Sequence, residues 1–356
     1  MTLAGSPATA TLVIANALAR YDRNPRRRLS RNSRLRRFLA ETALDHTAAP
    51  VHSAAMAETR SSTDWTLFLL LSFFWASAFA MTKVAVAGLP ASVIIPGRLI
   101  TATMIAWVVM AWRGEKLPRL SDRAAWLAII GMGTIGTALP FYAITLGQKT
   151  IDSSLAALII AAAPLFAASM AHLRFEDERI TANKVAGLVV GFAGVAVLLG
   201  RDAMQGLGNA DLIAQLLVLG GAFCYALNSI IARGAPKISS TVMPVGFLSV
   251  ASLSSLPMLA MTDWSIVRPD AMNITMVLAL GAIPTAAAGI LLVYLVQRTS
   301  ATFIALTGYV IPVMSAIIGY LAFRETQSPS ALAAFALILG GVWLAQRRQK
   351  TTPVSP

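Results

Sequence analysis

Ten long apolar runs, separated by short polar loops, dominate the chain from Thr66 onward. Each run has about 17–23 residues, which matches the ~30 Å hydrocarbon core of a bilayer at about 1.5 Å per helical residue. Backbone groups inside lipid must be hydrogen-bonded within their own segment, so apolar runs of this length are predicted to be helices. The predicted spans are 66–87, 90–111, 124–145, 155–173, 183–200, 212–232, 242–261, 274–296, 301–323 and 329–346.

Composition also favours a chain whose surface faces lipid. Of the 356 residues, 56% are hydrophobic and 13% are charged, whereas a soluble domain carries about 25% charged residues. The net charge of +13 would suggest nucleic acid as the partner of a soluble protein. Here we interpret the basic residues as orientation signals and a basic tail, so the lipid bilayer is the expected partner and nucleic acid is not.

The chain offers few groups for a metal site or for catalysis. Its one cysteine, Cys224, excludes an internal disulfide and a cysteine-based zinc cluster, and its three histidines are widely scattered. No Asp or Glu lies inside a predicted span, so the sequence does not support an ion relay built on buried carboxylates. We therefore expect no metal, no cofactor and no catalytic residue. His172, near the inner end of the fourth span, is the remaining candidate for ion coupling.

Residues 1–64 are rich in arginine and contain no long apolar run. Such a composition fits a disordered cytoplasmic tail, and it is also the composition of an organelle transit peptide. A third interpretation is an over-extended gene start over residues 1–55, with the true start at Met56. We assign no function to this tail, and residues 347–356 are expected to form a short cytoplasmic tail.

Basic residues are distributed unequally between the two sides of the predicted membrane region. Cytoplasmic loops of membrane proteins carry an excess of Lys and Arg. If the N-terminus is cytoplasmic, the inside connections hold most of these residues, and the outside connections hold only Lys149, Arg201, Arg268 and Arg324. Both termini are therefore predicted to face the cytoplasm.

Residues 65–200 and 201–346 repeat one another, with corresponding residues 147 to 149 positions apart. Five spans per half is an odd number, so the second half must enter the membrane from the opposite side. Inverted repeats are typical of secondary transporters, whose binding site lies between the halves. The predicted fold is an all-α integral membrane protein with ten transmembrane helices arranged as two inverted five-helix repeats. The repeated pairs are Pro96 and Pro244, Gln148 and Gln297, Pro164 and Pro312, Phe175 and Phe323, Glu178 and Glu325, and Gly194 and Gly341.

Several short motifs occur in a characteristic order along the chain. They are Phe74-Trp75-Ala76-Ser77-Ala78-Phe79 with Lys83 in the first span, Arg98-Leu99 in the second, and Glu178-Arg179-Ile180-Thr181 before Gly187, Gly191 and Gly194. Together they resemble the EamA-type family of the drug/metabolite transporter superfamily over about residues 65–346. The second half repeats the glutamate motif as Arg324-Glu325-Thr326, without the glycine and arginine of the family pattern.

This resemblance implies export or exchange of small metabolites, such as amino-acid-like solutes, across a bacterial inner membrane by alternating access. A small-molecule substrate is therefore the expected partner, and the protein is expected to be a monomer or a homodimer. Two alternatives remain open: a lipid or polyprenyl-carrier flippase of the same superfamily, and a polytopic membrane enzyme. The loops offer only Glu176-Asp177-Glu178 as an acidic cluster, with no histidine nearby, so an enzyme is not predicted.

Two basic residues, Lys83 and Arg98, lie inside the predicted spans. A charge inside the membrane is costly, so each is a candidate for substrate binding. Lys83 lies about five residues from the end of its span and could instead reach the headgroups. Arg98 lies deeper, about 12 Å from the outer end of the second span, and its guanidinium suits a substrate carboxylate. The repeat counterpart of Arg98 is near Gly246, so only the first half carries this charge.

Other candidates are neutral. Trp75, Tyr142 and Asn228 are predicted to line a cavity, although aromatic residues near span ends are often interface anchors. Pro164 and Pro312 are candidate helix breaks at a midplane cavity, with a packing kink as the alternative. Further features have structural interpretations. Gly187-x-x-x-Gly191 and Gly340-Gly341 favour close helix packing, and Glu178 and Glu325 favour caps or links to Arg179 and Arg324, with a gating salt bridge as the alternative.

Overall fold

A computed structural model describes residues 61–175, 181–203, 210–299 and 301–346, which belong to one compact unit, Arg60–Pro356. Predictions for residues 1–60, for Glu178 and Arg179, and for residues 347–356 lie outside the described residues. All regular elements in the described ranges are helical, and ten helical segments are long and apolar enough to cross a membrane. The prediction of ten transmembrane helices is confirmed.

The first five spans are α3 (Ser62–Val86), α4 (Ala91–Trp112), α5 (Arg123–Gly133) continued by η1 (Thr134–Ala138) and α6 (Leu139–Gly147), α7 (Ser153–Ile160) with α8 (Ala163–Arg174), and α9 (Ala182–Ala203). The last five are α10 (Ala210–Gly234), α11 (Val242–Ala260), α12 (Ala271–Leu280) continued by η3 (Gly281–Ala287) and α13 (Ala288–Arg298), α14 (Ala301–Ala305) with α15 (Thr307–Phe323), and α16 (Pro329–Gln346). A short 3₁₀ turn, η2 (Trp264–Ile266), lies between the seventh and eighth spans.

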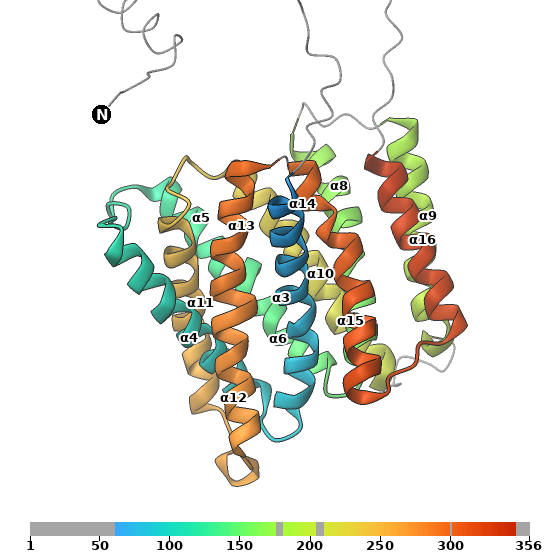
Figure 1. Ribbon diagram of the computed structural model, residues 1–356, viewed down its shortest axis with the longest axis horizontal. Helices are drawn as coiled ribbons and strands as arrows, with labels where there is room; N and C mark the ends of the chain where they lie inside the picture. Colours follow the sequence, from blue (N-terminus) through green and yellow to red (C-terminus); the bar gives the residue numbers. More distant parts are fainter. Residues whose placement is uncertain (1–60, 176–180, 204–209, 300, 347–356) are drawn as a thin grey trace, which may run out of the picture. The chain divides into compact units, whose positions relative to one another are not determined.

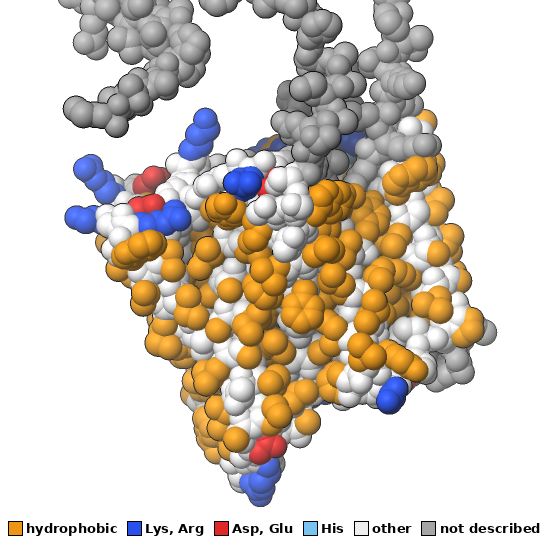
Figure 2. All heavy atoms as spheres, in the orientation of Figure 1, with side chains coloured by type: hydrophobic (Ala, Val, Ile, Leu, Met, Phe, Trp, Pro, Cys, Tyr) orange, Lys and Arg blue, Asp and Glu red, His pale blue; other side chains and the backbone are white. Residues whose placement is uncertain are grey.

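The outer surface of the described region is that of a membrane protein. Figure 2 shows apolar side chains covering the middle of the visible face, with charged side chains gathered at its two ends. Large apolar residues such as Val108, Val189 and Leu321 are exposed. Exposed apolar area on this scale would be a liability in water, whereas lipid solvates it.

Capping residues set where two of the spans begin. The Ser61 side chain accepts a hydrogen bond from the Asp64 backbone N–H, so α3 begins at Ser62, four residues before the predicted span. Asp270 and Asn273 form a reciprocal capping box at the start of α12. Such caps satisfy N–H groups that have no partner inside the helix.

The packing of the helices confirms the inverted repeat. The repeat relates α3 to α10, α4 to α11 and α9 to α16, and the third span to the eighth (Figure 1). Where α3 packs on α15 and α12, the related α10 packs on α7, α8 and α5; where α4 packs on η3, α11 packs on η1. The self-related pairs α4–α11 and α9–α16 also pack together. These contacts therefore recur when the two halves are exchanged, as expected for halves related by a two-fold axis.

Individual glycines repeat this exchange at the level of atoms. A Cβ at Gly194 would lie 2.8 Å from the Ala334 backbone oxygen, and one at Gly341 would lie 2.5 Å from the Gly187 backbone oxygen. These distances are shorter than a carbon can tolerate, so α9 and α16 touch backbone to backbone. The prediction of close packing by small residues is confirmed for this pair.

The third and eighth spans each contain a π-helical segment at equivalent positions, η1 and η3. In η1 the Thr137 hydroxyl donates to the Met132 carbonyl, five residues back, and in η3 the Thr285 hydroxyl donates to the Leu280 carbonyl. π-helical turns are rare and frequently lie at functional sites. A functional site is therefore expected beside η1 and η3.

Candidate functional site

A cavity of about 640 Å³ lies between the two repeats. Residues of α3, α4, the third span, α10, α11, η3 and α13 line most of it, so both halves contribute. This volume is within the range of about 300–1,000 Å³ that is usual for small-molecule sites. Its location agrees with the prediction of a site at the interface of the halves.

The two ends of the cavity differ in their access to solvent. At one end, the lining includes the exposed residues Arg113, Ser240 and Gln297. At the other end, it includes Thr82 and Gln148, which are both 3% exposed. The cavity is therefore open at the Arg113 end and closed at the end near Lys83.

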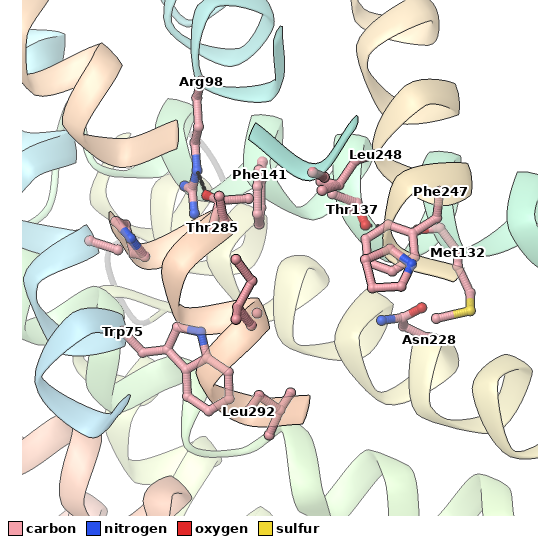
Figure 3. Close-up of a pocket in the computed structure, with 18 of the residues that line it drawn as sticks. Trp75, Arg98, Met132, Thr137, Phe141, Asn228, Phe247, Leu248, Thr285 and Leu292 are labelled. Atoms are coloured by element: carbon pink, nitrogen blue, oxygen red, sulfur yellow. Dashed lines mark hydrogen bonds between the residues drawn. The ribbon is translucent and has the colours of Figure 1, made fainter. Parts of the chain in front are cut away.

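Arg98 projects from α4 into the cavity lining and is buried. Its Nε donates a hydrogen bond of 2.9 Å to the Thr285 hydroxyl, and its guanidinium lies 3.7 Å from the centre of the Phe141 ring (Figure 3). Among the described residues, no carboxylate pairs with this guanidinium and no group accepts a hydrogen bond from its Nη atoms. The Arg98 cation is thus held by stacking on Phe141 and by a hydrogen bond to the neutral Thr285 hydroxyl.

The neutral candidates separate into two groups. Trp75 and Asn228 line the cavity with Arg98, whereas Tyr142 packs beside it in an apolar cluster with Leu99 and Leu248. The Asn228 side-chain oxygen is buried, has no hydrogen-bond partner among the described residues, and lies against Gly136, where a Cβ would collide with it. The structure thus brings two of the three neutral candidates together with Arg98.

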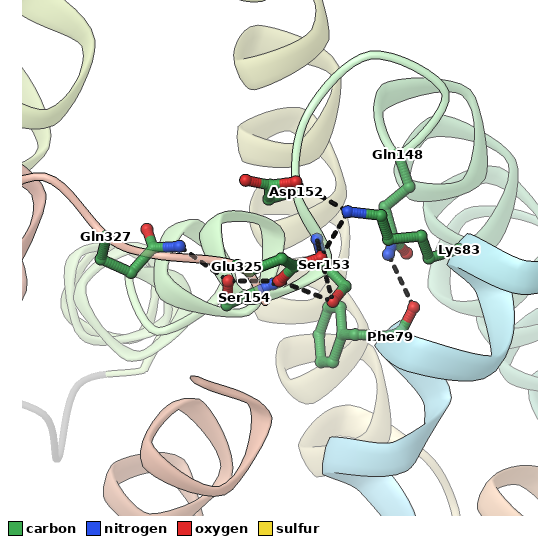
Figure 4. Close-up of polar contacts among 8 residues, drawn as sticks. All are labelled: Phe79, Lys83, Gln148, Asp152, Ser153, Ser154, Glu325 and Gln327. Carbon is green, nitrogen blue, oxygen red and sulfur yellow. Dashed lines mark hydrogen bonds and ion pairs between the residues drawn. The ribbon is translucent and has the colours of Figure 1, made fainter. Parts of the chain in front are cut away.

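Lys83 lies outside the cavity lining and belongs to a polar cluster at the closed end, which we call the seal: Lys83, Asp152, Ser153, Ser154 and Glu325 (Figure 4). Its ammonium lies 2.7 Å from Asp152 Oδ1 and 2.6 Å from Glu325 Oε1. The Glu325 side chain is 2% exposed, whereas that of Asp152 is 47% exposed. The seal connects the first span, the start of the fourth and the segment after the ninth.

The Glu325 carboxylate binds the N-terminus of α7. It accepts hydrogen bonds from the backbone N–H groups of Ser153 and Ser154 at 3.1 and 3.0 Å, and from both serine hydroxyls. A helix N-terminus favours an anion because its first N–H groups are free and its dipole is positive there. Glu325 is therefore a cap, but its ion pair is with Lys83 and not with Arg324.

A left-handed residue returns the chain so that Glu325 can reach this position. Arg324 ends α15 with φ 60°, and the Glu325 N–H then donates to the Gly319 carbonyl. The left-handed conformation is ordinarily taken by glycine at helix ends. The carboxylate lies directly over Gly319, where a Cβ would collide with it.

We expect the ionised Glu325 carboxylate in the seal to lose its stabilising effect only at acid pH. Burial raises the pKa of the Glu325 carboxyl, but hydrogen bonds from Lys83, Ser154 and Ser153 outweigh it and lower the pKa from 4.5 to about 2. A pKa lowered by folding stabilises the protein above the unfolded value, and this contribution disappears as the pH falls toward the folded value. The melting temperature of Glu325→Gln should lie below that of the unsubstituted protein at pH 7, and the gap should narrow between pH 4.5 and 2. A gap that stays constant down to pH 2 would contradict the assigned ionisation.

The two paired prolines lie away from the cavity. The fourth span is interrupted between Ile160 and Ala163, and Pro164 lies directly after this break at the start of α8. Pro312 lies inside the continuous helix α15 and lines a separate surface pocket. Neither proline lines the large cavity.

Sequence reasoning missed several residues that the structure places in the site. Thr285 and Phe141, which hold the Arg98 guanidinium, carry no charge and stand in ordinary apolar runs. The signal available for Thr285 was its repeat relation to Thr137, 148 residues earlier. Asp152 lies in a loop, and no local pattern connects it with Lys83.

Comparison with known proteins agrees with this architecture. The model of the EamA-like transporter family matches residues 65–200 and 212–346. The chain is 27% identical to the "Probable terminal-alkyne amino-acid exporter" of Streptantibioticus cattleyicolor over 81% of this chain and 94% of that protein. It is 24% identical to the "S-adenosylmethionine/S-adenosylhomocysteine transporter" of Chlamydia muridarum over 77% of this chain and 89% of that protein. A protein of known crystal structure shares the fold, with a TM-score of 0.57 and 20% identity over 81% of this chain and 97% of its own.

Proposed function

Because the chain belongs to the EamA-like transporter family, we propose that it exports or exchanges small, amino-acid-like metabolites by alternating access. The observation that carries this proposal is the cavity between the repeats, which is open at the Arg113 end and closed at the seal. In such a carrier, the site faces each side in turn as one half rocks against the other. Arg98 receives an anionic group of the substrate, and Trp75 and Asn228 contact the remainder.

The proposed membrane is the bacterial inner membrane, with both termini in the cytoplasm. The distribution of Lys and Arg between the loops supports this orientation. It makes the Arg113 end cytoplasmic, so the cavity is accessible from inside and the seal faces outward. An exporter loads its substrate from this inward-open conformation.

Transport by the purified protein tests the proposal directly. Full-length protein in liposomes should accumulate at least one labelled solute from a panel of amino acids, N-acyl amino acids, polyamines and nucleosides by counterflow, well above empty liposomes. Repeating the assay with and without proton and sodium gradients separates coupled from uncoupled transport. If no solute moves while a labelled lipid crosses the bilayer, the protein is a flippase and the carrier proposal fails.

A further inference from the structure

The cavity lining has two halves that are equivalent in position but different in charge. A Cβ at Gly281 would meet the Arg98 backbone oxygen, and a Cβ at Gly133 would meet the Phe247 backbone oxygen. The repeat therefore relates Arg98 to Phe247. Both residues line the cavity. Figure 3 shows Arg98 of the first repeat beside Thr285 of the second at one side of the cavity, and Phe247 of the second repeat near Met132 of the first at the other side. One half offers a cation and the other offers an apolar surface.

The cation is uncompensated by any described part of the protein. The described lining contains no Asp, Glu or Lys, and the only other charge in it is Arg113 at the exposed mouth. A buried charge without a counter-ion is costly, and a bound anion removes that cost. Arg98 thus gives the closed part of the cavity a preference for negative charge.

A positively charged group would find no comparable partner in this lining. Among the described residues, the acceptors Gln148 Oε1 and Asn228 Oδ1 lack hydrogen-bond partners but are closed off from the cavity space, and the other side-chain acceptors of the lining are neutral hydroxyls and amides. An ammonium group in the cavity would therefore lose its hydration without gaining a counter-charge. Free amino acids carry such a group beside their carboxylate.

Shape and polarity select the rest of the ligand. Trp75, Met132 and Phe247 line the cavity, and exposed apolar atoms form most of its wall. Aromatic and thioether side chains bind apolar groups by burial and ring contacts. The lining therefore matches a solute with an apolar body and a single acidic end.

We propose that the cavity selects organic anions, specifically carboxylates with an apolar body, against zwitterionic amino acids and organic cations. The carboxylate lies on the free Nη edge of Arg98, and the body lies toward Phe247. This assignment rests on the cavity being the transport site, and it narrows the substrate to an acid whose amine is absent or acylated.

Four solutes with one apolar body isolate the effect of charge. N-acetylphenylalanine, phenylalanine, N-acetylphenylalaninamide and phenylalaninamide share the benzyl group, and at pH 7 only the first carries net negative charge. Binding is measured by calorimetry on the full-length protein in detergent. N-acetylphenylalanine should bind about tenfold to a hundredfold more tightly than N-acetylphenylalaninamide, the range expected for a hydrogen-bonded charge, and phenylalaninamide should bind most weakly.

Two variants assign the preference to Arg98. Arg98→Met should abolish it by weakening N-acetylphenylalanine binding by about tenfold to a hundredfold while leaving N-acetylphenylalaninamide within about threefold. The control Arg119→Gln removes an exposed arginine outside the cavity and should keep the preference. Arg98→Lys keeps the charge and should retain part of it, which provides a second readout if the methionine variant does not fold.

Binding and flux together distinguish the two proposals. If phenylalanine or phenylalaninamide binds as tightly as N-acetylphenylalanine, if none of the four binds to folded protein, or if Arg98→Met keeps the same order, the anion selectivity is wrong. Counterflow of any solute then still supports a carrier. Anion-selective binding without flux of any solute would instead overturn the carrier and leave the selectivity of the cavity standing.

Discussion

Replacing Glu325 with glutamine should open the closed end of the cavity and reduce transport more than tenfold. Glutamine keeps the size of the side chain but leaves Lys83 paired only with the more exposed Asp152, and it weakens the cap on α7. Losing the hydrogen bonds to a buried charged acceptor typically costs about 1.5–3 kcal/mol. A cost of that size, specific to the closed conformation, changes its ratio to the open conformation by about tenfold to a hundredfold.

Accessibility of Thr82 measures the opening. Thr82 lines the closed end and is 3% exposed. In a Cys224→Ala background, a Thr82→Cys substitution should react with a membrane-impermeant thiol reagent from the Lys83 side only when Glu325→Gln is also present. Asp152→Asn is the matched control, because it removes the exposed carboxylate of the same lysine and should cost about 0–1 kcal/mol.

A second control separates gating from simple loss of stability. Replacing both partners of a buried ion pair with neutral residues is often tolerated, so Lys83→Met combined with Glu325→Gln should recover much of the melting temperature. A seal that gates transport would leave this double variant stable but leaky at the Lys83 end. If Glu325→Gln lowers the melting temperature and Thr82→Cys still does not react, the cluster is structural and does not gate.

Substituting Gly341 with alanine should destabilise the protein by about 2–3 kcal/mol, at the upper part of the usual range for overpacking. The added Cβ would lie 2.5 Å from the Gly187 carbonyl oxygen and the Gly191 Cα, and backbone atoms cannot move aside as a side chain can. α9 and α16 would have to separate along their whole contact. The measurement is the melting temperature of the purified protein in detergent.

The neighbouring residue provides the control for Gly341. Gly340 is exposed, and a Cβ there would meet nothing within 4 Å. Gly340→Ala changes the same helix with the same chemistry, and alanine favours a helix over glycine by about 1 kcal/mol. Its melting temperature should be unchanged or slightly higher. Equal losses for the two variants would contradict the close contact between α9 and α16.

The sequence by itself determined the number of helices, the inverted repeat and the limits of each span to within about four residues. Each of these follows from a local rule: lipid requires apolar helices of a fixed length, and two similar odd-numbered halves must be inverted. Even the close packing at Gly341 could be predicted, because small residues on a membrane helix leave room only for another backbone. Arg98, Trp75 and Asn228 could be named as candidates because charge and polarity are unusual inside a span.

Tertiary structure alone decided which of these residues meet. Lys83 and Glu325 are 242 residues apart, and their ion pair forms because α3 packs on α15 and brings its last turn to the start of α7. Arg98 and Phe247 are related by the repeat, but only Arg98 is charged. The difference in charge between the two sides of the cavity therefore arises only because the two repeats pack against each other. A linear pattern records which residues are costly in a membrane. It does not show which distant residue pairs with a buried charge, or whether that charge faces a cavity, because both depend on how the ten helices pack.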